Sequence, residues 1–155
     1  MTDVTIRDAT RADIPHLVEW NAAMAQETEG KTLDCDVLAR GIAAVFDDPH
    51  RGFYLVAERG VESAGCLLIT YEWSDWRNGD WWWLQSVYVV PAARRGGAFR
   101  ALYAEVERRA RAGPGVIGLR LYVERDNARA QKTYAALGME EERYRMFRRG
   151  FVELN

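Results

Sequence analysis

A junction near residue 90 constrains the fold more than any other part of this chain. An apolar run from Val87 to Val90 ends at Pro91, and paired arginines and paired glycines follow at residues 94–97, before a helical pattern that continues to Arg109. The first N–H groups of a helix lack intrahelical acceptors and lie at the positive end of its dipole. Glycine lets a phosphate approach the backbone without meeting a Cβ atom. The junction therefore predicts a pyrophosphate site where a strand turns into a helix.

Two common phosphate motifs do not fit this turn. A P-loop ends in Gly-Lys-Ser/Thr, which is missing here, and a dinucleotide fingerprint needs three spaced glycines, whereas Gly96 and Gly97 are adjacent. The segment instead resembles the acyl-CoA loop of the GNAT N-acetyltransferases, whose pattern is Arg/Gln-x-x-Gly-x-Gly/Ala after a strand ending in Val-x-Pro. Arg94 takes the first position of that pattern and Gly97 its central glycine.

Phe99 departs from this pattern, because the family usually has Gly or Ala at its position. Phe99 begins an apolar series at helical spacing, so we expect its ring to turn toward the core. The resemblance implies which residues bind CoA. The pyrophosphate residues would be Arg94, Arg95, Gly96, Gly97, Ala98, Phe99 and Arg100, and those for the pantetheine arm and acetyl carbonyl would be Val87, Tyr88 and Val89. From the residues alone, 87–89 could equally be an ordinary buried strand.

The composition favours a single globular domain and argues against nucleic-acid binding. A chain of 155 residues that is 48% hydrophobic suits one domain over residues 1–155, and a net charge of −2 gives no basic field for nucleic acid. Cys35 and Cys66 are isolated, without metal-ligand spacing, and predict free thiols in a reducing compartment. Because we find neither a secretory signal nor an apolar run of membrane-spanning length, we expect a cytoplasmic protein that uses no metal and no membrane.

The hydrophobic pattern predicts an alternation of strands and helices along the whole chain. In order, the predictions are a strand at 4–7, a helix after the Thr10–Asp13 capping box, a helix at 34–46, strands at 52–58, 64–72 and 81–90, the long helix, a strand at 119–124, a short helix at 127–137 and a final strand at 140–147. This β-α-α-β-β-β-α-β-α-β order is an α/β fold and is also the GNAT order. The resemblance thus covers nearly the whole chain and implies a mixed central sheet flanked by helices.

A second signature similar to that of GNAT proteins is Asn-x-x-Ala-x-x-x-Tyr followed by Leu-Gly. Here Asn127, Ala130 and Tyr134 match it, ahead of Leu137 and Gly138. The resemblance implies that Asn127 contacts the pantetheine arm and that Tyr134 faces the thioester sulfur. A tyrosine is protonated at neutral pH and can give its proton to the leaving thiolate, so Tyr134 is the predicted general acid. The alternative is that Asn127 is a helix N-cap and Tyr134 a core aromatic.

The acceptor would need a general base. An alkyl amine with a pKa of about 10.4 is neutral about one time in 2,500 at pH 7, so a side chain or a water chain must take its proton. Glu72 is our first candidate and Glu124 the second, although each is more often a solvated carboxylate at a strand end.

Two further clusters have open interpretations. Acidic residues crowd the break between the first two predicted helices, where they would be either a rim that attracts a cationic amine or, more simply, solvated and capping residues: Glu27, Glu29, Asp34 and Asp36. Tryptophans flank the Asn78-Gly79 turn and predict either an acceptor wall or a homodimer contact: Trp73, Trp76, Trp81, Trp82 and Trp83. At least one of the last three is expected in the core.

These patterns together predict an N-acetyltransferase that moves acetyl from acetyl-CoA to a primary amine by direct attack in a ternary complex. The acceptor would be a small-molecule or peptide amine. Two rivals remain: an acyl-CoA-binding module without catalysis that serves sensing or interaction, and an unrelated nucleotide-binding domain.

Overall fold

The computed structural model describes residues 3–154, which divide into two compact units at residue 120. Residues 3–120 hold the whole sheet and the first three α-helices, and residues 121–154 hold one helix and an extended segment. None of the described helices is long and apolar enough to cross a membrane.

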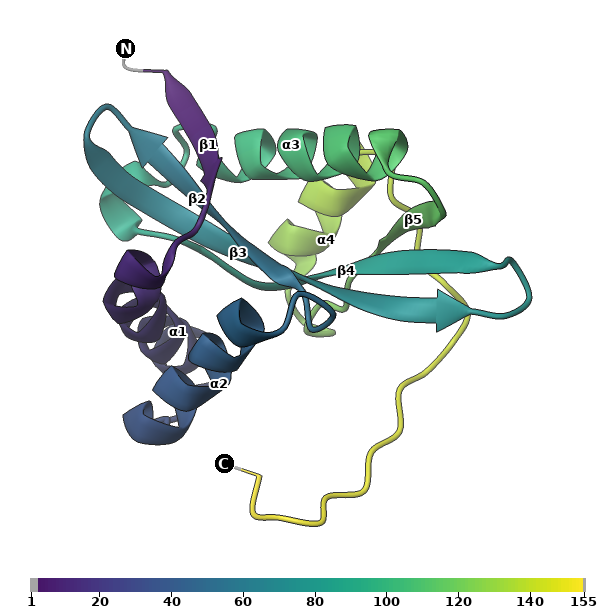
Figure 1. The fold of residues 1–155 in the computed structure, drawn as a ribbon, viewed down its shortest axis with the longest axis horizontal. Coiled ribbons are helices and arrows are strands. Elements are labelled where there is room, and N and C mark those ends of the chain that lie inside the picture. The colour runs from purple at the N-terminus through teal and green to yellow at the C-terminus, as the bar shows by residue number, and fades with distance from the viewer. Residues whose placement is uncertain (1–2, 155) are drawn as a thin grey trace. The chain divides into compact units, whose positions relative to one another are not determined.

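Five strands form one sheet in the order β1-β2-β3-β4-β5 (Figure 1). They are β1 (Val4–Asp8), β2 (Phe53–Arg59), β3 (Glu62–Ser74), β4 (Gly79–Val89) and β5 (Val116–Arg120). The pairs β1–β2, β2–β3 and β3–β4 are antiparallel, whereas β5 runs parallel to β4. A parallel neighbour requires a crossover, which α3 (Ala98–Ala112) provides. The mixed sheet confirms the predicted fold class.

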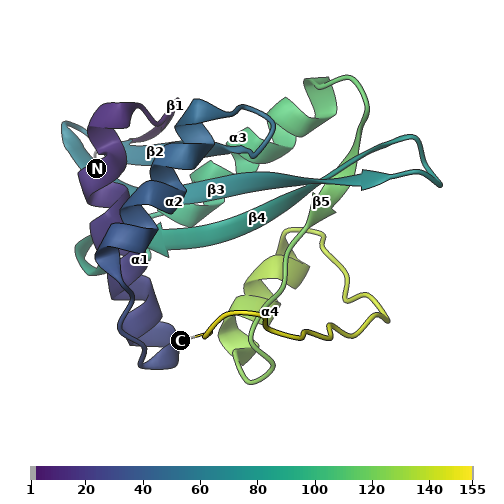
Figure 2. The same cartoon turned by 60° about the horizontal axis from the view of Figure 1, so that its bottom comes forward.

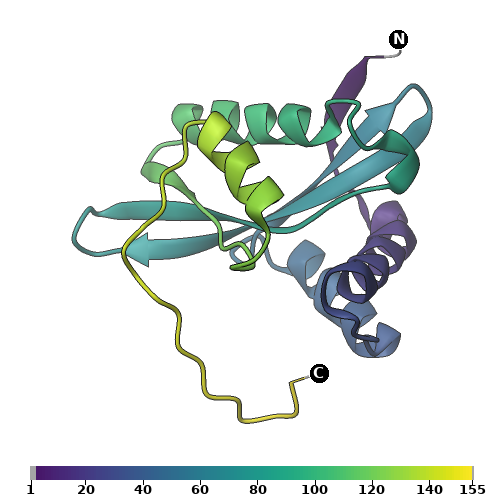
Figure 3. The same cartoon turned by 180° about the vertical axis from the view of Figure 1, so that it is seen from behind.

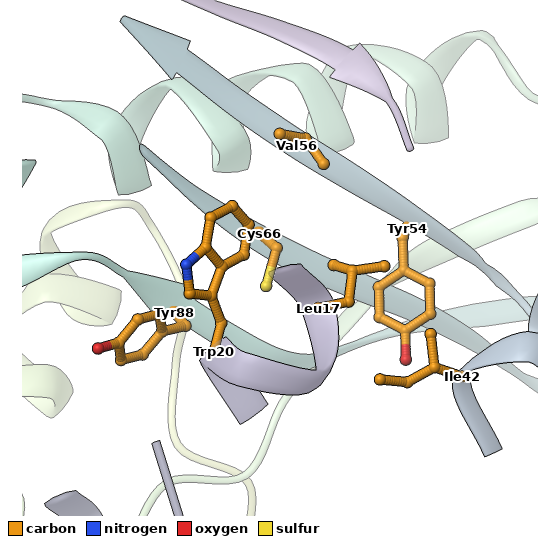
Figure 4. Packing of buried hydrophobic residues seen from close by; sticks show 7 residues of the cluster. All are labelled: Leu17, Trp20, Ile42, Tyr54, Val56, Cys66 and Tyr88. Atoms are coloured by element: carbon orange, nitrogen blue, oxygen red, sulfur yellow. The ribbon is translucent and has the colours of Figure 1, made fainter. Parts of the chain in front are cut away.

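Helices cover both faces of this sheet. The helices α1 (Ile14–Glu29) and α2 (Cys35–Asp47) lie side by side against one face, and α3 lies along the other (Figures 1 and 2). Successive strand residues point to opposite faces, so each buried strand supplies both layers. Figure 4 shows the layer under α1 and α2, which contains Leu17, Trp20, Ile42, Tyr54, Val56, Cys66 and Tyr88. The alternate residues Leu55, Leu67 and Ile69 are fully buried on the α3 side.

The entry to α1 is fixed by the predicted capping box. The Thr10 backbone N–H donates to the Asp13 carboxylate at 2.7 Å. Arg7 of β1 donates to both oxygens of the same carboxylate, at 2.8 and 2.9 Å, so the first strand and the first helix share one ion pair. Such bidentate pairs are stronger than neutral hydrogen bonds and more specific in geometry.

The strand β5 differs from its prediction. It spans Val116–Arg120 rather than 119–124, because its ladder with β4 runs from the pair Asp80 and Val116 to the pair Trp83 and Arg120. Gly115 allows this early start, since it ends the turn with a φ of 76°. Residues 121–124, although apolar in part, have no strand partner in the described chain.

In the second unit, α4 (Ala128–Ala136) forms as predicted, and Gly138 follows it with a φ of 92° that suits a helix end. The predicted final strand from Glu140 to Phe147 is wrong. Residues 139–154 contain neither helix nor strand and run as an extended segment (Figure 3). The alternating side chains of residues 140–147 define two faces, but a strand also needs hydrogen bonds to the backbone of a neighbouring strand. In addition, five of the eight residues in 140–147 are charged, which disfavours a strand.

Candidate functional site

The second half of β4 is paired on one side only. Its ladder with β5 ends at Trp83, while its ladder with β3 continues to Val89. Both Ser86 and Val87 stand opposite Leu67, which is a β-bulge, and Ser86 adopts a φ of 50°. No described strand pairs with residues 84–89 on the β5 side. The backbone there suits an extended ligand that adds like a strand.

This half-paired segment contains the predicted pantetheine residues Val87, Tyr88 and Val89. The bulge itself was not predicted. A Gln85-Ser86 pair interrupts the apolar run and was the only sequence signal for it. The bulge lies just after Trp83, the last residue of β4 that pairs with β5, and a bulge bends its strand.

The loop after β4 leads directly into the N-terminus of α3. A short 3-10 turn, Pro91–Ala93, is followed by Arg95 with a φ of 65° and by Gly97 with a φ of 85°. The first ladder hydrogen bond of α3 joins the Ala101 N–H to the Gly97 carbonyl at 2.9 Å. The N–H groups of residues 98–100 therefore precede the helical ladder and lie at its positive end.

Gly96 and Gly97 of the loop meet different structural requirements. A Cβ atom added to Gly97 would meet nothing within 4 Å, so the backbone there faces open space. A Cβ atom on Gly96 would lie 1.7 Å from the guanidinium of Arg59, which donates to the Gly96 carbonyl at 3.0 Å. Gly96 thus fits the loop against the end of β2, and Gly97 leaves room for a ligand beside the helix N-terminus.

Phe99 is half-buried, so the expected inward turn is only partly right. The buried line of α3 advances by four residues at each step, through Ala98, Leu102, Val106 and Ala110. This places Phe99 one position off that line, where its ring lies 6.3 Å from the ring of Tyr103. Its aromatic surface packs along the helix in part, and the first core position belongs to Ala98.

Arg94 is held by three groups of its own unit. Its Nε donates to the Val89 carbonyl at 3.0 Å, and its Nη2 donates to the Glu27 carboxylate at 2.6 Å. The guanidinium also lies 5.6 Å from the centre of the Tyr88 ring. The predicted pyrophosphate arginine and the predicted pantetheine strand are therefore in contact. The contact with Glu27 had no signal in the sequence.

In the second unit, Asn127 and Tyr134 occupy α4 as the motif requires. The Asn127 side-chain oxygen accepts from the Ala130 N–H at 3.1 Å, which makes Asn127 the N-cap of α4. Tyr134 is half-buried, and burial raises its pKa above the usual value near 10. Its hydroxyl is accordingly protonated at neutral pH.

The two candidate bases differ in their surroundings. Glu72 accepts from the Trp83 indole N–H at 2.8 Å and from Arg120, whose guanidinium also lies 4.1 Å from the centre of the Trp81 ring. Lone pairs used in this way are less available to a substrate proton. Glu124 is exposed, and its carboxylate accepts from the Asp126 N–H at 2.8 Å.

The acidic and tryptophan clusters are distributed over several structural roles. Asp34 caps α2 by accepting from the next turn, whereas Glu27 binds Arg94. Trp73 and Trp76 are exposed near the β3–β4 turn, and Trp81, Trp82 and Trp83 are each half-buried, so none of these three is a fully buried core residue. The Trp81 ring lies against the Arg120 guanidinium, and the Trp83 indole N–H donates to Glu72.

The arrangement suits a ligand with a diphosphate and an extended amide-containing arm. Arginines at positions 94, 95 and 100 and the N-terminal N–H groups of α3 supply charge and donors for phosphate oxygens. The open side of Gly97 supplies space, and the half-paired β4 supplies backbone partners for the arm. Coenzyme A has both parts, and the residues present fit it.

Comparisons with known proteins show the family and the fold. Residues 14–139 match the model of the "Acetyltransferase (GNAT) family". A "possible acetyltransferase from Clostridium difficile 630" is 39% identical, with a TM-score of 0.90 over 97% of this chain and 99% of that one. No curated protein gives a match.

More distant solved structures share the fold. The aminoglycoside N-acetyltransferase AAC(6')-Iy in complex with CoA is 18% identical, with a TM-score of 0.77 over 98% of this chain and 97% of that one. A "transcriptional regulator from Bacillus halodurans C-125" is 22% identical, with a TM-score of 0.80 over 96% of this chain and 100% of that one. At these identities the likeness concerns architecture alone.

Proposed function

Since the chain belongs to the GNAT acetyltransferase family, we propose that it transfers an acetyl group from acetyl-CoA to a primary amine by direct attack in a ternary complex. The observation that carries this proposal is the continuous path from the half-paired end of β4, through Gly97 with its open side, to the N-terminus of α3. The family match crosses residue 120, so we also propose that both units serve one functional domain.

In this proposal, the residues after β4 hold the donor. Arg94, Arg95, Arg100 and the backbone of residues 96–99 would bind the pyrophosphate, and residues 87–89 would bind the pantetheine arm through their backbone. Acetyl-CoA supplies an activated thioester. Backbone N–H groups of β4 near the bulge would stabilise negative charge on the carbonyl oxygen, because fixed donors are worth most where charge develops.

The residues of the second unit have roles that rest on the family resemblance and on their chemistry. Asn127 would orient the pantetheine arm, and its capping bond fixes where its side chain stands. Tyr134 would give its proton to the leaving thiolate, which its raised pKa permits at neutral pH. Because Glu72 is already held by Trp83 and Arg120, a water chain or Glu124 is the better candidate to accept the amine proton.

Calorimetry with acetyl-CoA tests the first half of the proposal. We expect saturable binding, with ATP and NAD as controls that should give no heat. Release of free thiol on addition of an amine panel then tests transfer. Binding without thiol release from any amine would favour the rival function, an acyl-CoA-binding module for sensing or interaction. Binding of ATP or NAD in place of CoA would contradict both.

The acceptor would be a small-molecule or peptide amine. Three further points remain predictions from the sequence: a cytoplasmic location, a homodimer, and the absence of nucleic-acid and membrane partners. A structural neighbour that acts on aminoglycosides makes cationic amines a sensible first group for the panel.

A further inference from the structure

The carboxylate of Glu27 stands at the predicted pyrophosphate arginine. Glu27 lies in the last turn of α1, far in sequence from the loop after β4. Its Oε2 accepts from Arg94 Nη2 at 2.6 Å, and its Oε1 accepts from the Tyr88 hydroxyl at 3.2 Å. One side chain thus contacts both the loop and the strand that precedes it.

This contact uses the same chemistry that a phosphate would use. A guanidinium binds carboxylate and phosphate oxygens through the same fork of N–H donors. Arg94 holds the Val89 carbonyl through Nε, so its Nη2 end is turned toward Glu27. The hydrogen bond from Arg94 lowers the pKa of Glu27 below its usual range, and Glu27 is therefore an anion at neutral pH.

We propose that Glu27 tunes the donor site by competing with the diphosphate for Arg94, which lowers the affinity for every ligand that carries a diphosphate. When a diphosphate binds, the ion pair between Arg94 and Glu27 is replaced by one between Arg94 and a phosphate oxygen, and Glu27 keeps the Tyr88 hydroxyl. The cost of this exchange is the same for every diphosphate ligand. A ligand that also carries a pantetheine arm offsets the cost through its contacts with β4, and a bare phosphate compound has no such contacts. This inference rests on the proposed function.

The test measures the affinities of three probes by calorimetry at low salt: CoA, pantetheine and inorganic pyrophosphate. In Glu27→Gln the amide oxygen still accepts from Tyr88, but the competing charge is gone. We expect CoA and pyrophosphate to bind roughly fivefold more tightly than to the wild type, the upper range for one exposed ion pair. Pantetheine, which lacks the diphosphate, should bind equally to both.

Glu29→Gln is the matched control, since Glu29 lies at the same helix end and pairs with Lys31 at 4.0 Å rather than with the loop. It should leave all three affinities unchanged. The gain in Glu27→Gln should shrink as salt rises and should vanish when Arg94→Gln is added. A folded Glu27→Gln protein whose CoA affinity is unchanged or weaker would overturn the inference.

Failure of the proposed function gives a different result. If the wild type binds no CoA, the donor assignment fails, but pyrophosphate still decides the role of Glu27. Tighter pyrophosphate binding by Glu27→Gln supports competition for Arg94. Equal or absent pyrophosphate binding in both proteins rejects it.

Discussion

Tyr134 is the residue whose substitution separates chemistry from binding most clearly. Tyr134→Phe removes one hydroxyl and keeps the half-buried ring, so the fold of α4 should remain. As the proposed proton donor its loss should lower kcat by about 10²-fold with little change in acetyl-CoA affinity. Steady-state kinetics and calorimetry together measure this split. Unchanged kcat would remove Tyr134 from the mechanism.

Glu72 is a second single residue whose role depends on its neighbours, because they determine whether its carboxylate is available as a base. Its place near the end of a predicted strand made it a candidate base, and the sequence carried no sign of Arg120 from β5 or of the Trp83 indole. Both partners come from other strands of the sheet. The residue type thus indicated what chemistry a glutamate can perform. The register of the strands determined which side chains bind its carboxylate.

At the scale of elements, the turn into α3 offers a matched pair of substitutions. Gly97 and Gly30 both have positive φ, 85° and 63°, and a Cβ atom on either would meet nothing within 4 Å. Gly97→Ala and Gly30→Ala should therefore each lower the free energy of unfolding by about 1 kcal/mol through backbone strain alone. Urea unfolding measures this.

The two variants should differ in ligand binding, because only Gly97 borders the proposed pyrophosphate position. We expect Gly97→Ala to weaken CoA binding at least tenfold, roughly the effect of displacing one phosphate from its donors. Gly30→Ala, at the end of α1, should bind CoA as the wild type does. Equal CoA affinities in both variants would contradict the assignment of the loop.

The junction of β1 with α1 makes a prediction about pH. Hydrogen bonds from Arg7 hold the pKa of Asp13 below its usual range near 3.8. A carboxyl group with a depressed folded pKa adds stability above its unfolded pKa, and this stability is lost as the pH falls through the folded pKa. Asp13→Asn should therefore be less stable than the wild type at about pH 6, and the difference should narrow toward about pH 3. Urea unfolding at both pH values checks this, and a constant difference would contradict it.

Across the whole molecule, local sequence patterns predicted most helices and strands. The features that they did not predict depend on contacts between residues that are distant in the sequence. The strands and helices up to α3 and the helix at 128–136 follow from periodicity, caps and turn residues. The bulge at Ser86, the early start of β5 and the contact of Glu27 with Arg94 each depend on a partner distant in sequence. For the same reason, the alternation in 140–147 did not suffice for a strand.

The extended segment after α4 has a consequence for how the protein would be handled. Residues 143–149 contain four arginines, and the structure gives their backbone no helix or strand to protect it. Proteases cleave chains that can enter their active sites in extended form, which backbone in a sheet or helix cannot do. Brief trypsin treatment should therefore cut first between Arg143 and Arg149 and leave a fragment that ends there, detectable by its intact mass. A first cut inside α3, which also contains arginines, would show that the two regions open in the reverse order.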